Sequence, residues 1–327
     1  MIRLVVLDGA ALNPGDLSWE PLAALGELIV HPRSAPAECV SRARGAAVVL
    51  TNKTRLDRSF FEALPELRLV AVLATGTDIV DLEGAAEHGV KVMNVPEYGT
   101  ASVAQQTLAL LLEVATGTGL HDAAVHAGTW TRAVDWTFWQ RPLLELEGRT
   151  FGIVGFGRIG RRVAKLAEAL GMRVIAAQWE PSAAFLGPPL ADVSSPQPVR
   201  RGLDELFAES DVVSLHCPLT PATRQLVDAR RLALMRREAI LINTARGALI
   251  DEPALAAALH AGHLRGAGLD VLSVEPPPAD HPLLSAPRCV ITPHIAWATT
   301  AARQRLMTIT AENLKTWGRA FNFSARV

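Results

Sequence analysis

The chain has 327 residues and a mass of 35.0 kDa, with 49% hydrophobic and 20% charged residues, so it is long enough for about two domains with apolar cores. Its formal net charge is -1 and its Lys and Arg residues are spread along the chain, which argues against nucleic acid or an anionic membrane surface as a partner. No apolar run approaches the roughly 18 residues of a membrane span, so we expect a cytoplasmic protein that acts on a small molecule.

The three cysteines are Cys39, Cys217 and Cys289. They are odd in number, lie far apart, and show neither CxxC nor Cys/His ligand spacing. We therefore expect reduced thiols in the protein core and no metal site.

The first part of the chain, from Met1 to about Asn94, alternates short β-branched runs with helical patterns. The runs are "RLVVLD", "AAVVLT", "RLVAVLAT" and "VKVMNV", and they are apolar on both faces. Runs of this kind, separated by helices, predict an α/β unit with a parallel sheet covered by helices.

A long buried helix is predicted from Thr100 onward, where "TASVAQQTLALLLEVATG" has apolar residues at helical spacing. We expect this helix to link the two domains. The segment that follows brings Trp130, Trp136, Phe138 and Trp139 within ten positions and has no regular periodicity. It is either an irregular loop packed on a neighbouring part of the chain or a subunit contact, and its aromatic content favours the contact.

A second α/β unit begins at Arg149 with the stretch "TFGIVGFGRIG". Gly155, Gly157 and Gly160 have the GxGxxG spacing, follow a predicted strand and open a predicted helix. In that context the glycines allow a tight turn, close approach of the backbone to a pyrophosphate, and close packing of helix and strand. The stretch therefore predicts a dinucleotide site, with Arg158 either beside the phosphates or on the solvated surface.

The residue that would bind the adenosine ribose is unusual. An acidic residue is expected roughly 20 positions after the glycines, but the strand "RVIAA" ends in Gln178, and Glu180 lies two residues further on. No Lys or Arg appears until Arg200 and Arg201, so the sequence shows no evident clamp for a 2′-phosphate. This pattern favours NAD over NADP, although NADP stays possible, and residues 181–202, rich in Pro and Ser, are expected to form an exposed loop.

Polar residues follow three later apolar strands, at the edge where open α/β sheets bind ligands. They are Arg246 in "LINTARGALIDEPAL", Asp270 and Glu275 in "GAGLDVLSVEPPPADHPLL", and His294 in "VITPHIAWAT". Taken singly, His294 suits a structural role, Arg246 a helix cap and Glu275 a solvated turn. Together with "GFGRIG", these motifs resemble the D-isomer-specific 2-hydroxyacid dehydrogenase family over nearly the whole chain.

The resemblance implies two α/β domains. Residues 1–98 plus 297–327 would form a flavodoxin-like substrate-binding domain, and residues 99–296 a doubly wound Rossmann domain that binds NAD(P). It also implies hydride transfer between NAD(P)H and a small 2-keto acid, and a homodimer. Closure of the cleft over substrate would use hinges near residues 95–100 and 295–299.

The family also implies a role for each polar residue. His294 would be the acid/base that exchanges a proton with the substrate oxygen. Glu275 would hold the imidazole ring and favour its charged form. Arg246 would bind the substrate carboxylate through its planar fork and polarise the carbonyl.

Other residues are assigned by the same resemblance. Thr75, Gly76 and Thr77 in "LATGTDIVDL" look like the family's substrate loop, although they would also suit an ordinary strand-to-helix turn. The family usually has an acidic residue where this chain has Gln105, which leaves the hydrogen bonding there open. The remaining expected cofactor contacts are Val103, Thr107, Ile159, Cys217, Pro218, Thr223, Thr244, Ala245, Asp270 and Ala296.

Within the family, "ATGTDIVDL", "VSLHCPLTPATRQLV", "VLSVEPP" and "ITPHIAWAT" are most similar to glycerate dehydrogenases, which are hydroxypyruvate reductases. Glu275 argues against the formate dehydrogenase branch, where the partner of the histidine is glutamine. We therefore expect hydroxypyruvate or glyoxylate as substrate. Two alternatives stay open: a bulkier keto acid such as phenylpyruvate, if residues 130–139 reach the active site, and a non-enzymatic NAD-sensing corepressor.

Overall fold

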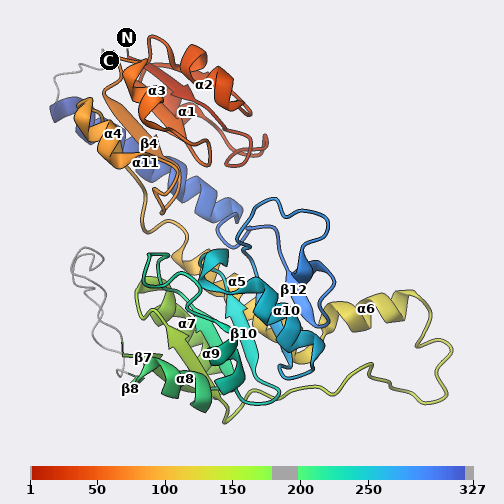
Figure 1. Cartoon of the computed structure of the whole chain (residues 1–327). Coiled ribbons are helices and arrows are strands. Elements are labelled where there is room, and N and C mark those ends of the chain that lie inside the picture. The colour runs from red at the N-terminus through yellow and green to blue at the C-terminus, as the bar shows by residue number, and fades with distance from the viewer. Residues whose placement is uncertain (1, 179–197, 321–327) are drawn as a thin grey trace. The chain divides into compact units, whose positions relative to one another are not determined.

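The computed structural model describes residues 2–178 and 198–320. The chain divides into two compact units, one made of Met1–Gly99 with Trp297–Val327 and the other of Thr100–Ala296. We call them unit 1 and unit 2, and Figure 1 shows their elements. The chain passes from one unit to the other twice, after Gly99 and after Ala296.

Unit 1 contains a five-stranded parallel sheet made of β1 (Arg3–Val6), β2 (Glu27–Val30), β3 (Val48–Thr51), β4 (Leu69–Val72) and β5 (Lys91–Met93). The strand order is β2-β1-β3-β4-β5, the flavodoxin-like order. Its helices are α1 (Glu20–Ala23), α2 (Pro36–Ala43), α3 (Arg58–Glu62), α4 (Leu82–Glu87) and α11 (Thr300–Ala320).

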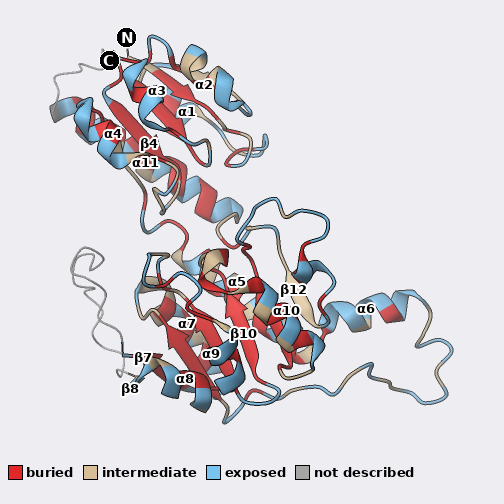
Figure 2. Cartoon of the chain, in the orientation of Figure 1, coloured by how far each residue is buried: buried red, intermediate tan, exposed pale blue. Residues whose placement is uncertain are grey.

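The core of unit 1 explains why its strands are apolar on both faces. Leu4 and Val6 of β1 belong to a buried cluster with α1 and α11, whereas Val5 and Leu7 belong to a second cluster with α2, α3 and α4. Alternate residues of one strand point to opposite faces, so helices cover both faces and the strands are buried between them (Figure 2).

Unit 2 contains a seven-stranded parallel sheet made of β6 (Thr150–Val154), β7 (Arg173–Ala177), β8 (Val199–Arg201), β9 (Val212–Leu215), β10 (Ile240–Asn243), β11 (Gly266–Leu269) and β12 (Cys289–Ile291). The order is β12-β11-β10-β9-β6-β7-β8, so the direction of winding reverses between β6 and β9. This is the doubly wound Rossmann order, and the predicted fold class is confirmed for both units.

Helices cover both faces of this sheet as well. One face carries α5 (Thr100–Thr116) and α7 (Arg158–Ala169), and the other carries α8 (Leu203–Glu209), α9 (Ala229–Leu234) and α10 (Glu252–His260). No single helix in the described ranges is long and apolar enough to cross a membrane. α5 and α6 (Thr118–His126) pass that test only as a pair, which is bent by 61° around Gly117, and much of α5 is buried in the core.

The expected exposed loop over residues 181–202 is wrong at its end. Val199–Arg201 form β8, which pairs in parallel with β7, so that Arg200 lies opposite Ala176. A three-residue edge strand is too short to produce a periodic signal in a sequence. Residues 179–197, including Glu180, lie outside the part of the chain that the structure describes.

The three cysteines carry free thiols. Cys39 and Cys217 are buried as expected, but Cys289 packs against the core while remaining half-buried. Burial raises the pKa of both Cys217 and Cys289 to about 12. These two thiols therefore stay protonated and unreactive at neutral pH.

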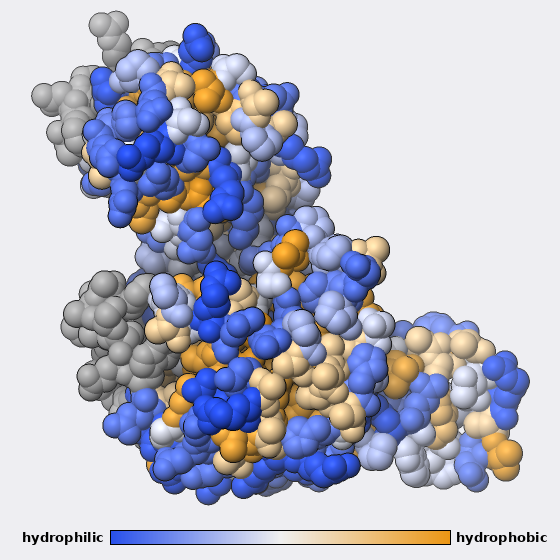
Figure 3. Space-filling model, viewed as in Figure 1, coloured by the Kyte–Doolittle hydropathy of each residue, from blue (hydrophilic) through white to orange (hydrophobic). Residues whose placement is uncertain are grey.

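The aromatic segment after α6 lacks helix and strand up to Thr150 and extends away from the rest of unit 2 (Figure 1). Most of its large apolar side chains are exposed, with 85% of Trp136 and 65% of Trp139 accessible to solvent, whereas Phe138 is half-buried and Leu146 is buried. Hydrophobic and hydrophilic residues are mixed on the surface of this projecting part (Figure 3). In the isolated chain its aromatic side chains therefore remain largely unburied.

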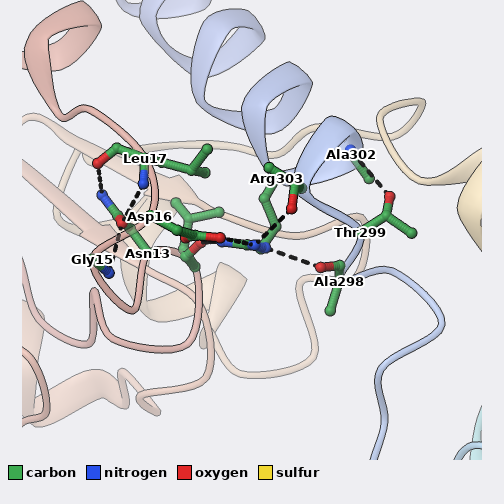
Figure 4. Close-up of polar contacts among 10 residues, drawn as sticks. Asn13, Gly15, Asp16, Leu17, Ala298, Thr299, Ala302 and Arg303 are labelled. Atoms are coloured by element: carbon green, nitrogen blue, oxygen red, sulfur yellow. Dashed lines mark hydrogen bonds and ion pairs between the residues drawn. The ribbon is translucent and has the colours of Figure 1, made fainter.

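In unit 1 the residues after the second crossing are held by Arg303 of α11, which is 7% exposed (Figure 4). Its guanidinium binds the carboxylate of Asp16 through two bonds of 2.7 and 2.6 Å, and donates to the carbonyl oxygens of Leu12 and Ala298 at 2.9 Å. One buried cation thus joins the start of α11 to the N-terminal loop.

Candidate active site

The expected acid/base, His294, contacts its expected partner in unit 2. Its Nδ1 lies 2.7 Å from Oε2 of Glu275, and the other carboxylate oxygen accepts a bond of 3.1 Å from the backbone N–H of Leu272. With Nδ1 donating to the carboxylate, Nε2 is the ring nitrogen left to exchange a proton with a ligand. The His294 side chain is 23% exposed, so a ligand can reach it.

The turn that carries His294 is strained and held by Asp270. His294 has a φ of +54°, a left-handed conformation that costs a non-glycine residue roughly 1–2 kcal/mol. The Asp270 carboxylate accepts bonds from the Thr292 hydroxyl at 2.5 Å and from the N–H groups of Ile295 at 3.0 Å and Ala296 at 2.8 Å. Burial raises the pKa of Asp270, while these bonds oppose that rise. Asp270 therefore positions the histidine.

Arg246 follows β10 at the same edge of the sheet. The side chain of Asn243 accepts from the Ala245 N–H at 3.0 Å and donates to the Arg246 carbonyl at 2.9 Å, which fixes the backbone before and at Arg246. The next residue, Gly247, leaves no room for a side chain, because a Cβ there would lie 1.9 Å from the carbonyl carbon of Leu272. The backbone after Arg246 thus packs against the loop that leads to Glu275.

A buried pair that the sequence did not single out holds this loop. Glu252, at the start of α10, accepts from the backbone N–H of Ser273 at 2.7 Å and also binds its hydroxyl. His281 lies 3.2 Å from the same carboxylate, and Glu252 and His281 are only 6% and 8% exposed. An acidic residue in the first turn of a helix is common, so nothing in the sequence separated Glu252 from an ordinary helix start.

Helix α5 also contacts the residues that follow β10 and β12, at the carboxyl edge of the sheet. The Ser102 hydroxyl donates to the carbonyl of Ala296 at 2.5 Å, and the hydroxyls of Thr107 and Thr244 lie 3.0 Å apart. Gln106 donates to the Thr292 hydroxyl at 3.2 Å, whereas Gln105, the residue that departs from the family pattern, is exposed. The sequence drew attention to Gln105, but the polar contact with the histidine segment comes from its neighbour. Val103, another expected cofactor contact, is half-buried.

The glycine-rich turn after β6 fits a dinucleotide. Gly155 has a φ of +100°, and a Cβ there would lie 2.5 Å from the His216 backbone; a Cβ on Gly160 would lie 2.2 Å from the carbonyl oxygen of Gly155. Gly157, in contrast, faces open space, because a Cβ there would meet no atom within 4 Å. Gly155 and Gly160 thus allow the tight turn. Gly157 leaves the backbone uncovered at the start of α7, where a pyrophosphate would approach.

The other expected cofactor contacts follow strands beside this turn. Cys217 and Pro218 come after β9, which neighbours β6 at the point where the winding reverses. Thr223 is fully buried, and its hydroxyl donates to the Pro218 carbonyl at 2.8 Å and accepts from the Thr220 N–H at 2.7 Å, so it shapes the loop. Gln178 is exposed at the end of β7. Contacts of these residues with a cofactor stay predictions, as do those of Arg158, Ile159 and Ala245.

The expected substrate loop lies in unit 1, after β4. The Thr75 hydroxyl donates to the Val95 carbonyl at 3.2 Å, and the Asn94 side chain donates to the Thr75 carbonyl at 2.6 Å. Thr77 accepts from the N–H of Val80 at 2.9 Å, which closes a turn. The loop is therefore held by the two residues that follow β5 and by its own turn, and substrate contacts of Thr75, Gly76 and Thr77 stay predictions.

Comparison with known proteins identifies relatives over nearly the whole chain. Residues 108–296 match the model of the family described as D-isomer specific 2-hydroxyacid dehydrogenase, NAD binding domain. A hydroxypyruvate reductase from Blautia hydrogenotrophica is 47% identical over 317 residues, covering 96% of both chains. A glycerate dehydrogenase from Methylorubrum extorquens is 36% identical over 282 residues, covering 86% of this chain and 85% of the relative.

A solved structure of similar fold is the NADPH-dependent glyoxylate/hydroxypyruvate reductase from Sinorhizobium meliloti in complex with NADP and malonate. It is 29% identical, with a TM-score of 0.80, and the match covers 97% of this chain and 93% of that one. The protein is thus an NAD(P)-dependent oxidoreductase, and the chain belongs to the D-isomer specific 2-hydroxyacid dehydrogenase family.

Proposed function

We propose that the protein reduces a small polar 2-keto acid, hydroxypyruvate or glyoxylate, with NAD(P)H, in the cytoplasm. The observation that carries this proposal is the His294–Glu275 pair at 2.7 Å, on a turn that Asp270 holds in place. The relatives from Blautia, Methylorubrum and Sinorhizobium are named as hydroxypyruvate reductase, glycerate dehydrogenase and glyoxylate/hydroxypyruvate reductase, which supports the substrate class. The free thiols fit a reducing compartment.

The proposed roles follow from the chemistry of keto-acid reduction. A bound nicotinamide supplies the hydride to one face of the carbonyl carbon. His294 donates its Nε2 proton to the carbonyl oxygen, and Glu275 stabilises the imidazolium before that transfer. Arg246 binds the substrate carboxylate through two N–H groups and polarises the carbonyl, and backbone N–H groups of residues 75–77 bind the same carboxylate.

The contacts of the aromatic segment favour a small substrate over a bulky one. Arg265 donates to the carbonyls of Ala115, at 3.2 Å, and of Pro142, and so ties the base of the segment to unit 2. Arg265 directly precedes β11, whose other end leads to Asp270. The segment is therefore anchored at the amino edge of the sheet, whereas His294 and Glu275 follow its carboxyl edge.

The experiment that tests this function is a measurement of kcat/KM for hydroxypyruvate, glyoxylate, pyruvate and phenylpyruvate with NADH and with NADPH. We expect the first two substrates to give the highest values. A higher value for phenylpyruvate would contradict the substrate class. An absence of turnover with every keto acid, with dinucleotide binding intact, would reject the enzyme and favour a sensor of NAD(H).

The partner of the aromatic segment is proposed to be a second copy of the chain. Val134, Trp136 and Trp139 are 102%, 85% and 65% exposed, an unusual amount of apolar surface for a free loop. Sedimentation should give twice the 35.0 kDa mass for the wild type and a monomer for the double variant Trp136→Ser, Trp139→Ser. A wild type that sediments as a monomer would rule this homodimer out.

A further inference from the structure

Two arginines of unit 2 lie against one aromatic ring at the dinucleotide turn. Phe156 sits between Gly155 and Gly157, and the guanidinium carbons of Arg161 and Arg200 lie 5.5 and 5.0 Å from the centre of its ring. Arg161 comes from the first turns of α7 and Arg200 from β8. Two guanidinium groups from separate elements therefore lie at the glycine-rich turn.

The position of Arg200 follows from the pairing of β8 with β7. Its Nη1 donates to the carbonyl of Ala177 at 3.2 Å, and the N–H of Gln178 donates to the carbonyl of Arg201 at 2.6 Å. Arg200 thus lies at the end of β7, the place where a Rossmann domain binds the adenosine ribose of its dinucleotide. In the sequence Arg200 lies far from Gln178, which argued against a clamp for the 2′-phosphate. The pairing of β8 with β7 brings the two residues to the same end of the sheet.

Neither guanidinium has a carboxylate partner among residues 2–178 and 198–320. Arg161 donates to the backbone carbonyl of Phe156 at 3.3 Å, whereas the neighbouring Arg201 forms an ion pair of 2.9 Å with Glu209. Burial lowers the pKa of Arg200, and the charge of Arg161 lowers it further. The Phe156 ring offsets part of this repulsion, and an anion bound by both arginines would remove it.

We propose that Arg161 and Arg200 bind the 2′-phosphate of NADP(H), so that the protein prefers NADPH to NADH. The inference rests on the proposed function, because it requires a dinucleotide at the glycine-rich turn. A phosphate monoester carries close to two negative charges at neutral pH and accepts paired N–H bonds from the planar guanidinium group. Gln178 fits this ligand, since an amide at the end of β7 does not repel the phosphate as a carboxylate would.

The test is a calorimetric measurement of binding by the whole protein, without turnover. The probes are adenosine 2′,5′-bisphosphate and 5′-AMP, followed by NADPH and NADH. We expect the wild type to bind the bisphosphate at least about tenfold more tightly than 5′-AMP. Arg161→Gln and Arg200→Gln should each weaken binding of the two 2′-phosphorylated ligands roughly 10- to 100-fold, the range for a hydrogen bond to a charged group.

The same variants should bind 5′-AMP and NADH nearly as the wild type does, which also shows that they are folded. Arg162→Gln is the matched control, because Arg162 is the next residue of α7, is exposed, and loses the same charge. Equal affinity of the wild type for the two adenosine probes would overturn the inference, as would variants that lose NADH and NADPH alike. A wild type that binds neither dinucleotide would instead overturn the proposed function.

Discussion

The two nitrogens of the His294 ring have different surroundings. Nδ1 is bonded to Glu275, so the ring is oriented and Nε2 is left for the substrate. The same residue has a left-handed backbone conformation, and the Asp270 carboxylate accepts bonds from the N–H groups of the two residues that follow it. A residue that looks like one histidine among nine in the sequence is thus specified by two carboxylates from another strand end.

Replacing His294 by Ala should lower kcat with hydroxypyruvate about 10²- to 10⁴-fold, the usual contribution of general acid catalysis. Dinucleotide affinity should stay unchanged, because the cofactor is expected to bind at the glycine-rich turn. Steady-state kinetics measures kcat and calorimetry measures the dinucleotide affinity. The control is His260→Ala, at an exposed histidine of α10. Equal losses of affinity and rate would contradict the role as proton donor.

His216 predicts a pH-dependent stability. The protein around the His216 ring desolvates it and lowers its pKa from 6.5 to about 3. Between these two pH values the unfolded chain therefore binds a proton at His216 that the native state does not bind. Stability from this group is present above pH 6.5 and is lost as the pH falls toward 3. At pH 5 the loss in free energy of unfolding should be about 2 kcal/mol. Denaturant unfolding at pH 7 and pH 5 should show this difference in the wild type and a smaller one in His216→Gln; equal pH dependence would contradict it.

At the scale of elements, two segments contact the loop that carries Glu275, and a third contacts one of these two. Gly247 packs on the backbone of Leu272, Glu252 binds Ser273, and His281 binds Glu252. Glu252 and His281 are themselves buried. The loop is therefore positioned by α10 and the segment before the 3-10 turn Pro282–Leu284.

Glu252→Ala should leave the Ser273 N–H and His281 without their partner, at a cost of about 1–3 kcal/mol in free energy of unfolding. Because the loop loosens, kcat should fall while NADH affinity is retained. Glu252→Gln, which keeps an acceptor for the Ser273 N–H, should recover much of the kcat. Thermal unfolding and steady-state kinetics give both readouts, and a destabilised Glu252→Ala enzyme with normal kcat would show that the loop does not act on Glu275.

At the scale of the molecule, the residues on both sides of the two crossings are bonded within their own unit. In unit 2 the Ser102 hydroxyl binds the Ala296 carbonyl, and in unit 1 Arg305 donates two bonds, of 3.1 and 2.9 Å, to the Tyr98 carbonyl. The rings of Tyr98 and Trp297 also meet edge to face. The hinges expected near residues 95–100 and 295–299 include these anchored residues, and hinge motion stays a prediction.

Arg303→Ala tests whether a loss of stability in unit 1 leaves dinucleotide binding by unit 2 unchanged. It removes two bonds to Asp16 and those to the Leu12 and Ala298 carbonyls, so unit 1 should lose about 1–3 kcal/mol of stability. NADH affinity should stay unchanged, since the dinucleotide turn belongs to unit 2. Denaturant unfolding and calorimetry measure the two quantities, and Arg319→Ala, in the last turn of the same helix, is the control. A loss of NADH affinity in Arg303→Ala would contradict the separation.

The sequence by itself determined the features that are local. Alternating apolar strands and helices predicted both parallel sheets, because burial on both faces leaves a continuous apolar run in each strand. The spacing of Gly155, Gly157 and Gly160 predicted the turn after β6, because backbone conformation depends on adjacent residues. The family resemblance carried by the motifs around them was also enough to pair His294 with Glu275.

Only the tertiary structure decided which distant residues meet. The edge strand β8 brings Arg200 to the end of β7, α10 brings Glu252 to Ser273, and the Asp270 carboxylate turns inward to the segment around His294. Parallel pairing joins residues far apart in the chain, and it leaves no periodic trace in either partner. The positions that hold the site and set its charge therefore emerged from strand order and packing.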